Sequence, residues 1–177
     1  KEMDLAMSPA LDLARDMFLF SFYTRGMSFV DMAYLRKRDL KGGILTYRRR
    51  KTGQLLFIKW EKCMQMIVEK YEGIHSNYLL PIIKPFSEVD ERKQYLYAAH
   101  CINRSLKIIG CRLNLSIPLT MYVSRHSWAS IAKNKQIPIS VISEGMGHDS
   151  EATTRIYLAS LDTVAVDKAN HIILKSL

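Results

Sequence analysis

Apolar residues dominate the stretch between residues 11 and 23, whose sequence is LDLARDMFLFSFY. The members that recur at helical spacings are Leu13, Met17, Phe18, Phe20 and Phe22. Because these side chains would cover most of the circumference, the pattern predicts a helix that is buried in the core. The segment SFVDMAYL, which begins two residues after Gly26, predicts a second short helix.

Two runs that are rich in β-branched and aromatic residues come next. They are ILTYRRR, at residues 44–50, and QLLFIKW, at residues 54–60. Lys51, Thr52 and Gly53 lie between the runs, and Gly53 can adopt the positive φ that a tight turn requires. The sequence therefore predicts two strands of an antiparallel hairpin, preceded by a turn at residues 39–43.

Helical patterns recur in the rest of the chain. They predict helices over residues 61–71, 91–110, 121–134 and 151–160, with an extended apolar segment at 78–83 and a loop around Pro85. Pro138 suits the first turn of a further short helix that ends near Gly147, and Ser150 can cap the helix that follows. We therefore predict one domain over residues 1–160, mainly α with a small antiparallel β-sheet.

The last part of the chain, residues 161–177, has the apolar spacing of an amphipathic tail. Its apolar positions include Val164, Val166, Ile172 and Ile173. The pattern predicts a helical tail that docks either in cis or on a neighbouring protomer.

Composition limits the class of protein further. At 177 residues and 48% hydrophobic content, the chain can bury one core, and it lacks the run of about 20 apolar residues that a membrane helix needs. Three cysteines without a CxxC pair favour a reducing setting, so we expect a cytoplasmic protein. Since it begins at Lys1 without a cationic and apolar leader, we also expect a piece of a longer protein.

Positive charge points to the class of partner. The formal net charge is +9, from 26 basic and 17 acidic residues, which favours a polyanion such as nucleic acid. Eight basic residues gather between positions 36 and 51: Arg36, Lys37, Arg38, Lys41, Arg48, Arg49, Arg50 and Lys51. A solvated loop is the alternative interpretation of this cluster.

Candidate chemistry lies in the second half of the chain. Transfer of a phosphodiester without a metal needs a nucleophile, cations that hold the phosphate oxygens, and an acid that protonates the leaving oxygen. The segment YVSRHSWAS, at residues 122–130, is followed by Gly147-His148 and, nine residues later, by Tyr157.

These motifs resemble those of the tyrosine recombinases, the phage integrases. RHSWAS resembles their RHTFAT-like box, GMGH resembles their LGH turn, TRIYLAS resembles the helix of the nucleophilic tyrosine, and RRRKTGQ resembles the hairpin of the catalytic lysine. The resemblance covers residues 11–160. It implies the tyrosine recombinase catalytic-domain fold, and a site-specific recombinase that cuts and rejoins DNA for integration, excision or inversion.

The same resemblance implies the partners and the setting. The enzyme would act on double-stranded DNA with specific recombination sites and would associate into a tetramer on that DNA. It would need neither metal nor ATP, hence no cofactor. The setting would be a bacterial mobile element and a nucleoid-associated protein in the cytoplasm, with no membrane partner.

The resemblance also assigns roles to residues. Tyr157 would attack the phosphate to form a 3′-phosphotyrosine, Arg125 would clamp the phosphate with its planar fork of donors, and His148 would donate to it. Lys51 would be the general acid, with Arg50 or Arg49 as alternatives. The cluster of Arg48, Arg49, Arg50 and Lys51 would bind DNA through phosphates or bases.

The first family box, TGLRxxE/D, is where this sequence departs most. Anchoring on Gly26 and Asp31 puts Ser28 at the place of the arginine, so Ser28 would face the DNA without a charge. We expect Arg25 to substitute for the missing arginine, and Asp31 to be a buried residue that orients its neighbours. An arginine that stabilises a helix C-terminus is the other interpretation of Arg25.

A second departure lies at Tyr122, where the family commonly has the histidine of an HxxR pair. Three residues apart on a helix, Tyr122 and Arg125 share a face, so Tyr122 is expected to bind the phosphate. His126 is expected to be structural.

Two other function classes remain open at this point. Ser28 and Tyr122 are compatible with a degenerate recombinase that binds DNA without cutting it. A helix-turn-helix regulator would place the helix near residues 139–145 in the major groove, but Ile139, Val141 and Ile142 are apolar where polar side chains should meet base edges.

Overall fold

The computed structural model describes residues 8–72, 77–159 and 174–175. Within them the chain forms seven α-helices, a short 3-10 helix and a three-stranded antiparallel sheet. In order these are α1 Pro9–Tyr23, α2 Phe29–Ala33, η1 Lys37–Asp39, β1 Leu40–Lys41, β2 Ile44–Arg48, β3 Leu55–Lys59, α3 Lys62–Lys70, α4 Glu91–Arg112, α5 Met121–Asn134, α6 Ile139–Met146 and α7 Glu151–Ala159. The prediction of a mainly α fold with a small antiparallel sheet is confirmed.

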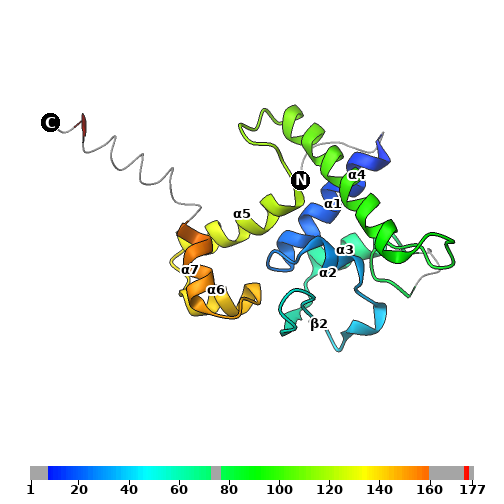
Figure 1. Cartoon of the computed structure of the whole chain (residues 1–177), viewed down its shortest axis with the longest axis horizontal. Helices are drawn as coiled ribbons and strands as arrows, with labels where there is room; N and C mark the ends of the chain where they lie inside the picture. The colour runs from blue at the N-terminus through cyan, green and yellow to red at the C-terminus, as the bar shows by residue number, and fades with distance from the viewer. Residues whose placement is uncertain (1–7, 73–76, 160–173, 176–177) are drawn as a thin grey trace.

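Helix α1 forms the centre of the main core. Met17 and Phe20 have no exposed surface, as the apolar spacing predicts, and Pro9 occupies the first turn, where a missing N–H is tolerated. The helix packs against α4, α5 and α3, and Figure 1 shows α4 crossing it.

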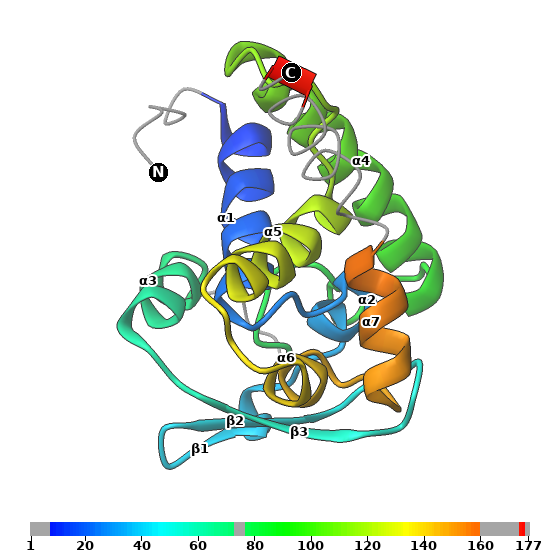
Figure 2. The same ribbon diagram turned by 90° about the vertical axis from the view of Figure 1, so that its left-hand side faces the viewer.

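The sheet lies along the lower edge of the view in Figure 2. Leu45 pairs with Ile58 and Tyr47 with Leu56, so alternate residues of β2 and β3 face the core. The turn predicted at residues 39–43 is narrower, since Gly42 and Gly43 form it, and Leu40 before it pairs with Leu45 to add strand β1.

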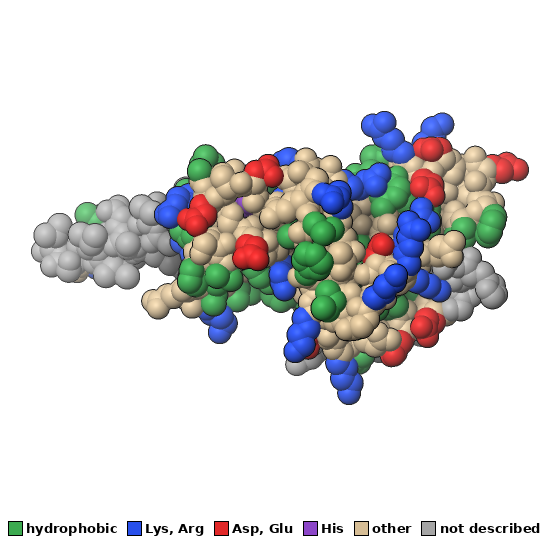
Figure 3. Space-filling model, turned by 90° about the horizontal axis from the view of Figure 1, so that it is seen from below, with side chains coloured by type: hydrophobic (Ala, Val, Ile, Leu, Met, Phe, Trp, Pro, Cys, Tyr) green, Lys and Arg blue, Asp and Glu red, His purple; other side chains and the backbone are tan. Residues whose placement is uncertain are grey.

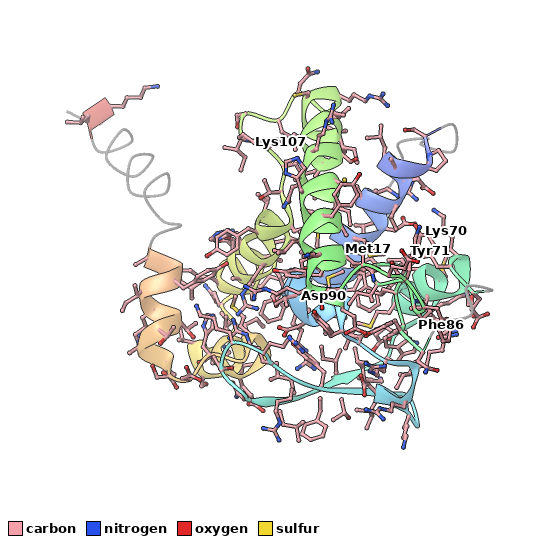
Figure 4. All side chains as sticks on the ribbon, turned by 45° about the vertical axis from the view of Figure 1, so that its right-hand side comes forward. Met17, Lys70, Tyr71, Phe86, Asp90 and Lys107 are labelled. Atoms are coloured by element: carbon pink, nitrogen blue, oxygen red, sulfur yellow. The ribbon has the colours of Figure 1, made fainter. Side chains whose placement is uncertain are left out.

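Charged groups attach α3 to α1. Asp16 is 4% exposed, and its carboxylate accepts hydrogen bonds from Lys70 at 2.7 Å and from the Tyr71 hydroxyl at 2.9 Å. Figure 4 shows Lys70 and Tyr71 side by side where α3 ends. The carboxylate is paired and hydrogen-bonded, as a buried charge must be if it is not to destabilise the fold.

Several elements differ from the prediction in their bounds or in their form. Helix α4 continues two residues further, to Arg112, and Pro138 is the N-cap of α6 instead of lying within its first turn. The extended segment predicted at residues 78–83 begins with an antiparallel bridge between Tyr78 and Arg36 and continues as bends and turns, in which Leu80 and Ile83 are buried. Ser150 caps α7 as predicted, since its Oγ accepts the Thr153 N–H at 3.3 Å.

A second, smaller core joins α5, α6 and α7. It consists of Ala129, Ala132, Ile142, Met146 and Leu158. The apolar side of α6 is therefore used for packing, which argues against a role for α6 as a recognition helix in a DNA groove.

The predicted tail over 161–177 lies outside the described residues apart from 174–175, so its docking stays a prediction. Among the helices that the structure describes, none combines the length and the apolar character that crossing a membrane requires.

Candidate active site

A cavity of about 500 Å³ lies where the loop before α2, the β2–β3 connection, α4, α5 and α7 meet. Seven of the ten residues singled out from the sequence line it: Ser28, Arg49, Lys51, Tyr122, Arg125, His148 and Tyr157. The other three, Arg25, Arg48 and Arg50, do not.

Arg125 connects the loop before α2 with the end of α6. It is 8% exposed, and its guanidinium donates to the carbonyl of Gly26 at 2.7 Å and to the carbonyl of Met146 at 2.8 Å. Burial, helped by the nearby Arg49, lowers the pKa of Arg125 to about 10. The side chain is therefore still a cation at neutral pH, held in a fixed orientation.

Gly26 makes this placement possible. It has φ +74°, and a Cβ atom at this position would lie 2.8 Å from the Arg125 Cα. Both the left-handed backbone and the close approach require glycine, so the glycine of the first box has a steric role beside Arg125.

His148 follows the helix-ending Gly147, which has φ +63°. Its Nε2 lies 3.0 Å from Nη2 of Arg125, and its Nδ1 lies 2.8 Å from Oγ1 of Thr154. Because arginine only donates, Nε2 must accept, and Nδ1 carries the proton that it donates to Thr154.

This tautomer bears on the predicted role of His148 as a donor to phosphate. Burial, together with the positive charges of Arg125 and Arg49, lowers the pKa of His148 to about 4. In the free protein the ring is neutral and its Nε2 points at Arg125, so it acts as an acceptor. Donation from Nε2 to a phosphate requires either an additional proton, which a bound anion would favour, or the other neutral tautomer.

Arg49 is the second buried cation of the cavity. It is 7% exposed, and its guanidinium donates to the carbonyl of Gly147, next to His148. Arg49 is close enough to Arg125 for its positive charge to disfavour the charged form of Arg125. Two buried arginines side by side are unfavourable unless an anion lies between them, so the pair indicates an anion site.

The basic residues from the end of β2 into the β2–β3 connection alternate between two pockets. The connection is longer than predicted, running from residue 49 to residue 54, with Gly53 at φ +74°. Arg49 and Lys51 line the cavity, whereas Arg48 and Arg50 line another pocket beside Asp31 and Tyr34.

Arg50 anchors the connection instead of lining the cavity. Its backbone N–H donates to Asp31 at 2.9 Å, and its guanidinium lies 3.8 Å from the centre of the Tyr34 ring. Asp31 is 4% exposed and also accepts from the Ser28 hydroxyl at 2.6 Å. It therefore has the buried, orienting place that the sequence predicts for it.

Tyr157 lies in an aromatic group. Its ring is stacked on His126, with 4.9 Å between centroids and 2° between planes, and Tyr122 meets His126 edge-on at 4.1 Å. Burial raises the pKa of Tyr157 well above its usual value, and the neighbouring Tyr122 acts in the same direction. The phenol is therefore protonated in the free protein.

Comparison with known proteins assigns the chain to a family. The model of the phage integrase family matches residues 17–163. The chain belongs to this family. No curated protein matches the sequence.

Solved recombinases have a similar fold. XerA recombinase is 17% identical, with a TM-score of 0.53 over 87% of this chain and 63% of that one. XerH in a post-cleavage complex with palindromic difH is 16% identical, with a TM-score of 0.65 over 97% and 48%. A λ integrase dimer bound to a COC′ core site is 17% identical, with a TM-score of 0.58 over 86% and 54%. The chain thus spans less than two thirds of each, and the likeness establishes the fold.

Arg25, which we expect to substitute for the missing arginine of the first box, is not among the residues that line the cavity. Arg25 has a positive φ of 63°, and its Cδ lies 3.6 Å from where a Cβ on Gly145 of α6 would stand. This conformation turns the side chain toward α6 and away from the cavity. Ser28 lines the cavity, as its alignment predicts, but it serves as the N-cap of α2, and Arg49 supplies the second cation.

Thr154 was not recognised from the sequence. It has no exposed surface, and it lies four residues before Leu158 on the buried face of α7. That spacing was the available signal, because a polar residue on an apolar helix face usually has a specific partner. In the part of the chain that the structure describes, no group of three His, Cys, Asp or Glu side chains suits a metal ion.

Proposed function

We propose that the chain is the catalytic domain of a site-specific DNA recombinase, with Tyr157 as the nucleophile. One observation carries the proposal: a nucleophile, two buried arginines and a lysine line one cavity although they come from distant parts of the chain. Arginine forks suit the paired oxygens of a phosphodiester, and the unfavourable proximity of two buried cations is relieved by an anion.

The reaction would proceed by transesterification. The Tyr157 oxygen attacks phosphorus and releases its phenolic proton to water while the bond to the 5′ oxygen breaks, and Lys51 gives that 5′ oxygen a proton. The product is a 3′-phosphotyrosine and a free 5′ hydroxyl. Because a phosphodiester is exchanged for a phosphotyrosine ester, the bond energy is conserved, and attack by another 5′ hydroxyl reverses the step without ATP.

Arg125 and Arg49 would hold the non-bridging oxygens as charge develops on them. His148 would first orient Arg125 and would then donate to the phosphate once the bound anion has raised the pKa of its ring. This order follows from the neutral tautomer of the free protein.

Double-stranded DNA is the proposed partner. The surplus of basic residues supports a polyanion, yet Figure 3 shows acidic and basic side chains mixed on the face it displays, so the cavity is a better guide than surface charge. Solved relatives include a λ integrase tetramer bound to a Holliday junction, which supports tetramer assembly on DNA as part of the proposal.

The test is covalent capture. The protein at its full natural length is incubated with nicked suicide duplexes, drawn from the DNA that flanks its own coding sequence, and a denaturation-resistant adduct is measured. An adduct in the parent that is lost in Tyr157→Phe supports the proposal, and peptide mapping should place the nucleotide on Tyr157. An adduct that persists in Tyr157→Phe contradicts it.

A recombinase fold that binds DNA without cutting it is the second candidate. Ser28 favours it, since a neutral side chain occupies the place of a family arginine. DNA binding without any adduct, in parent and variant alike, would support this alternative.

A further inference from the structure

The nucleophile on α7 contacts a histidine whose role the family motifs do not explain. The rings of His126 and Tyr157 are parallel within 2°, at a centroid distance of 4.9 Å. Tyr122 stands at 90° to His126 and at 89° to Tyr157, so one ring lies against the face of Tyr157 and another is perpendicular to it. Two neighbours in different directions restrict how the Tyr157 ring can turn.

His126 makes this contact as a neutral aromatic ring. Burial, with the adjacent Arg125, lowers the pKa of His126, so it carries no charge at neutral pH. Its Nδ1 is buried and has no hydrogen-bond partner among the described residues. A buried nitrogen without a partner lowers stability, so a histidine is a poor choice for simple packing. What this position does provide is ring contacts with Tyr157 and Tyr122.

The position of His126 along α5 adds a geometric argument. It directly follows Arg125, whose guanidinium is fixed by two carbonyls. Of these two consecutive residues, Arg125 is the proposed phosphate clamp and His126 contacts the proposed nucleophile. Because α7 belongs to the smaller core, this stacking sets the nucleophile of α7 against a helix that also packs on α1.

We infer that His126 is a positioning residue, which holds the Tyr157 ring by stacking so that its oxygen faces the phosphate bound at Arg125. The inference rests on the proposed function of Tyr157 as the nucleophile. Tyr122 completes the arrangement by its edge-on contact with the Tyr157 ring, at 6.4 Å between centroids.

The kinetic test replaces the ring and then restores it. His126→Leu keeps the approximate volume but cannot stack, and His126→Phe restores an aromatic face. His100→Leu, on the exposed side of α4, is the matched control. Adduct formation is measured in single turnover on a saturating suicide duplex that the parent cleaves, and affinity for the same duplex is measured separately.

We expect His126→Leu to form the adduct roughly 10- to 100-fold more slowly, the range associated with a small displacement of a reacting group. DNA affinity should be unchanged, and His126→Phe should recover most of the rate. A parental rate in His126→Leu, or equal losses in the Leu and Phe variants, would overturn the inference. If His126→Leu does not fold, His126→Gln provides the same comparison.

A measurement without DNA separates this inference from the proposed function. The protein is labelled with 3-fluorotyrosine, and the Tyr157 fluorine signal is identified by its loss in Tyr157→Phe. Loss of stacking in His126→Leu should shift and broaden that signal, while His100→Leu leaves it in place. An unchanged signal in His126→Leu refutes positioning even if Tyr157 proves to be the nucleophile. A shifted signal in a protein that never forms an adduct retains the positioning and rejects only the recombinase function.

Discussion

Replacing Arg49 by methionine tests how the site compensates for Ser28. The methionine keeps an unbranched chain in a place that is 7% exposed, but removes the charge and the hydrogen bond to Gly147. Loss of one electrostatic donor to a transition state commonly slows catalysis about 10²- to 10³-fold, on the order of 3 to 4 kcal/mol. We expect a loss of this size in adduct formation.

Stability should change much less than activity. Removing a charged hydrogen bond costs about 1.5 to 3 kcal/mol, but removing one of two adjacent buried cations relieves their repulsion and offsets part of that cost. Urea unfolding of parent and Arg49→Met should therefore give similar free energies, on the order of 1 to 2 kcal/mol apart.

Arg25→Met is the matched control, because Arg25 points toward α6 and does not line the cavity. It should cleave like the parent in the suicide-duplex assay. A further arm adds Ser28→Arg to Arg49→Met, which should restore part of the rate by returning an arginine to the first box. Parental cleavage in Arg49→Met together with a large loss in Arg25→Met would refute the assignment and restore Arg25 as the substitute.

Three other predictions concern the general acid, a glycine and a histidine. Lys51→Ala should slow adduct formation on an ordinary duplex. A duplex with a 5′-bridging phosphorothiolate should restore the rate, because its leaving group needs no proton. Equal defects on both substrates would show that Lys51 is not the general acid. Gly26→Ala should destabilise the protein by more than the roughly 1 kcal/mol expected of Gly53→Ala, because a Cβ at Gly26 would lie 2.8 Å from the Arg125 Cα, whereas a Cβ at Gly53 would meet nothing within 4 Å. Equal urea midpoints would contradict this. Folding lowers the pKa of His148 to about 4 from an ordinary value near 6.5, so as pH falls the unfolded chain binds the proton first, and the free energy of unfolding should decline between about pH 6.5 and pH 4. His148→Gln should flatten that decline in urea unfolding measured as a function of pH. An unchanged slope would argue against a buried neutral ring.

Local patterns were sufficient for the helices and for the order of the chemical motifs. Apolar spacing predicted α1 and placed Arg125, His148 and Tyr157 on or beside helices that the structure contains. Caps and turns were also accessible, as Ser150 and the positive φ of Gly53 show. These features depend on residues a few positions apart, which the sequence displays directly.

Side-chain direction across the cavity was decided by the tertiary structure. The sequence does not distinguish the four cations from Arg48 to Lys51. In the structure, Arg49 is the one of the three arginines that donates a hydrogen bond to the carbonyl of Gly147, 98 residues away. The positive φ of Arg25 turns it toward α6, and the tautomer of His148 depends on Arg125 and Thr154. Contacts between residues so far apart leave no periodic trace in the sequence, because they arise only when separate helices and turns pack together.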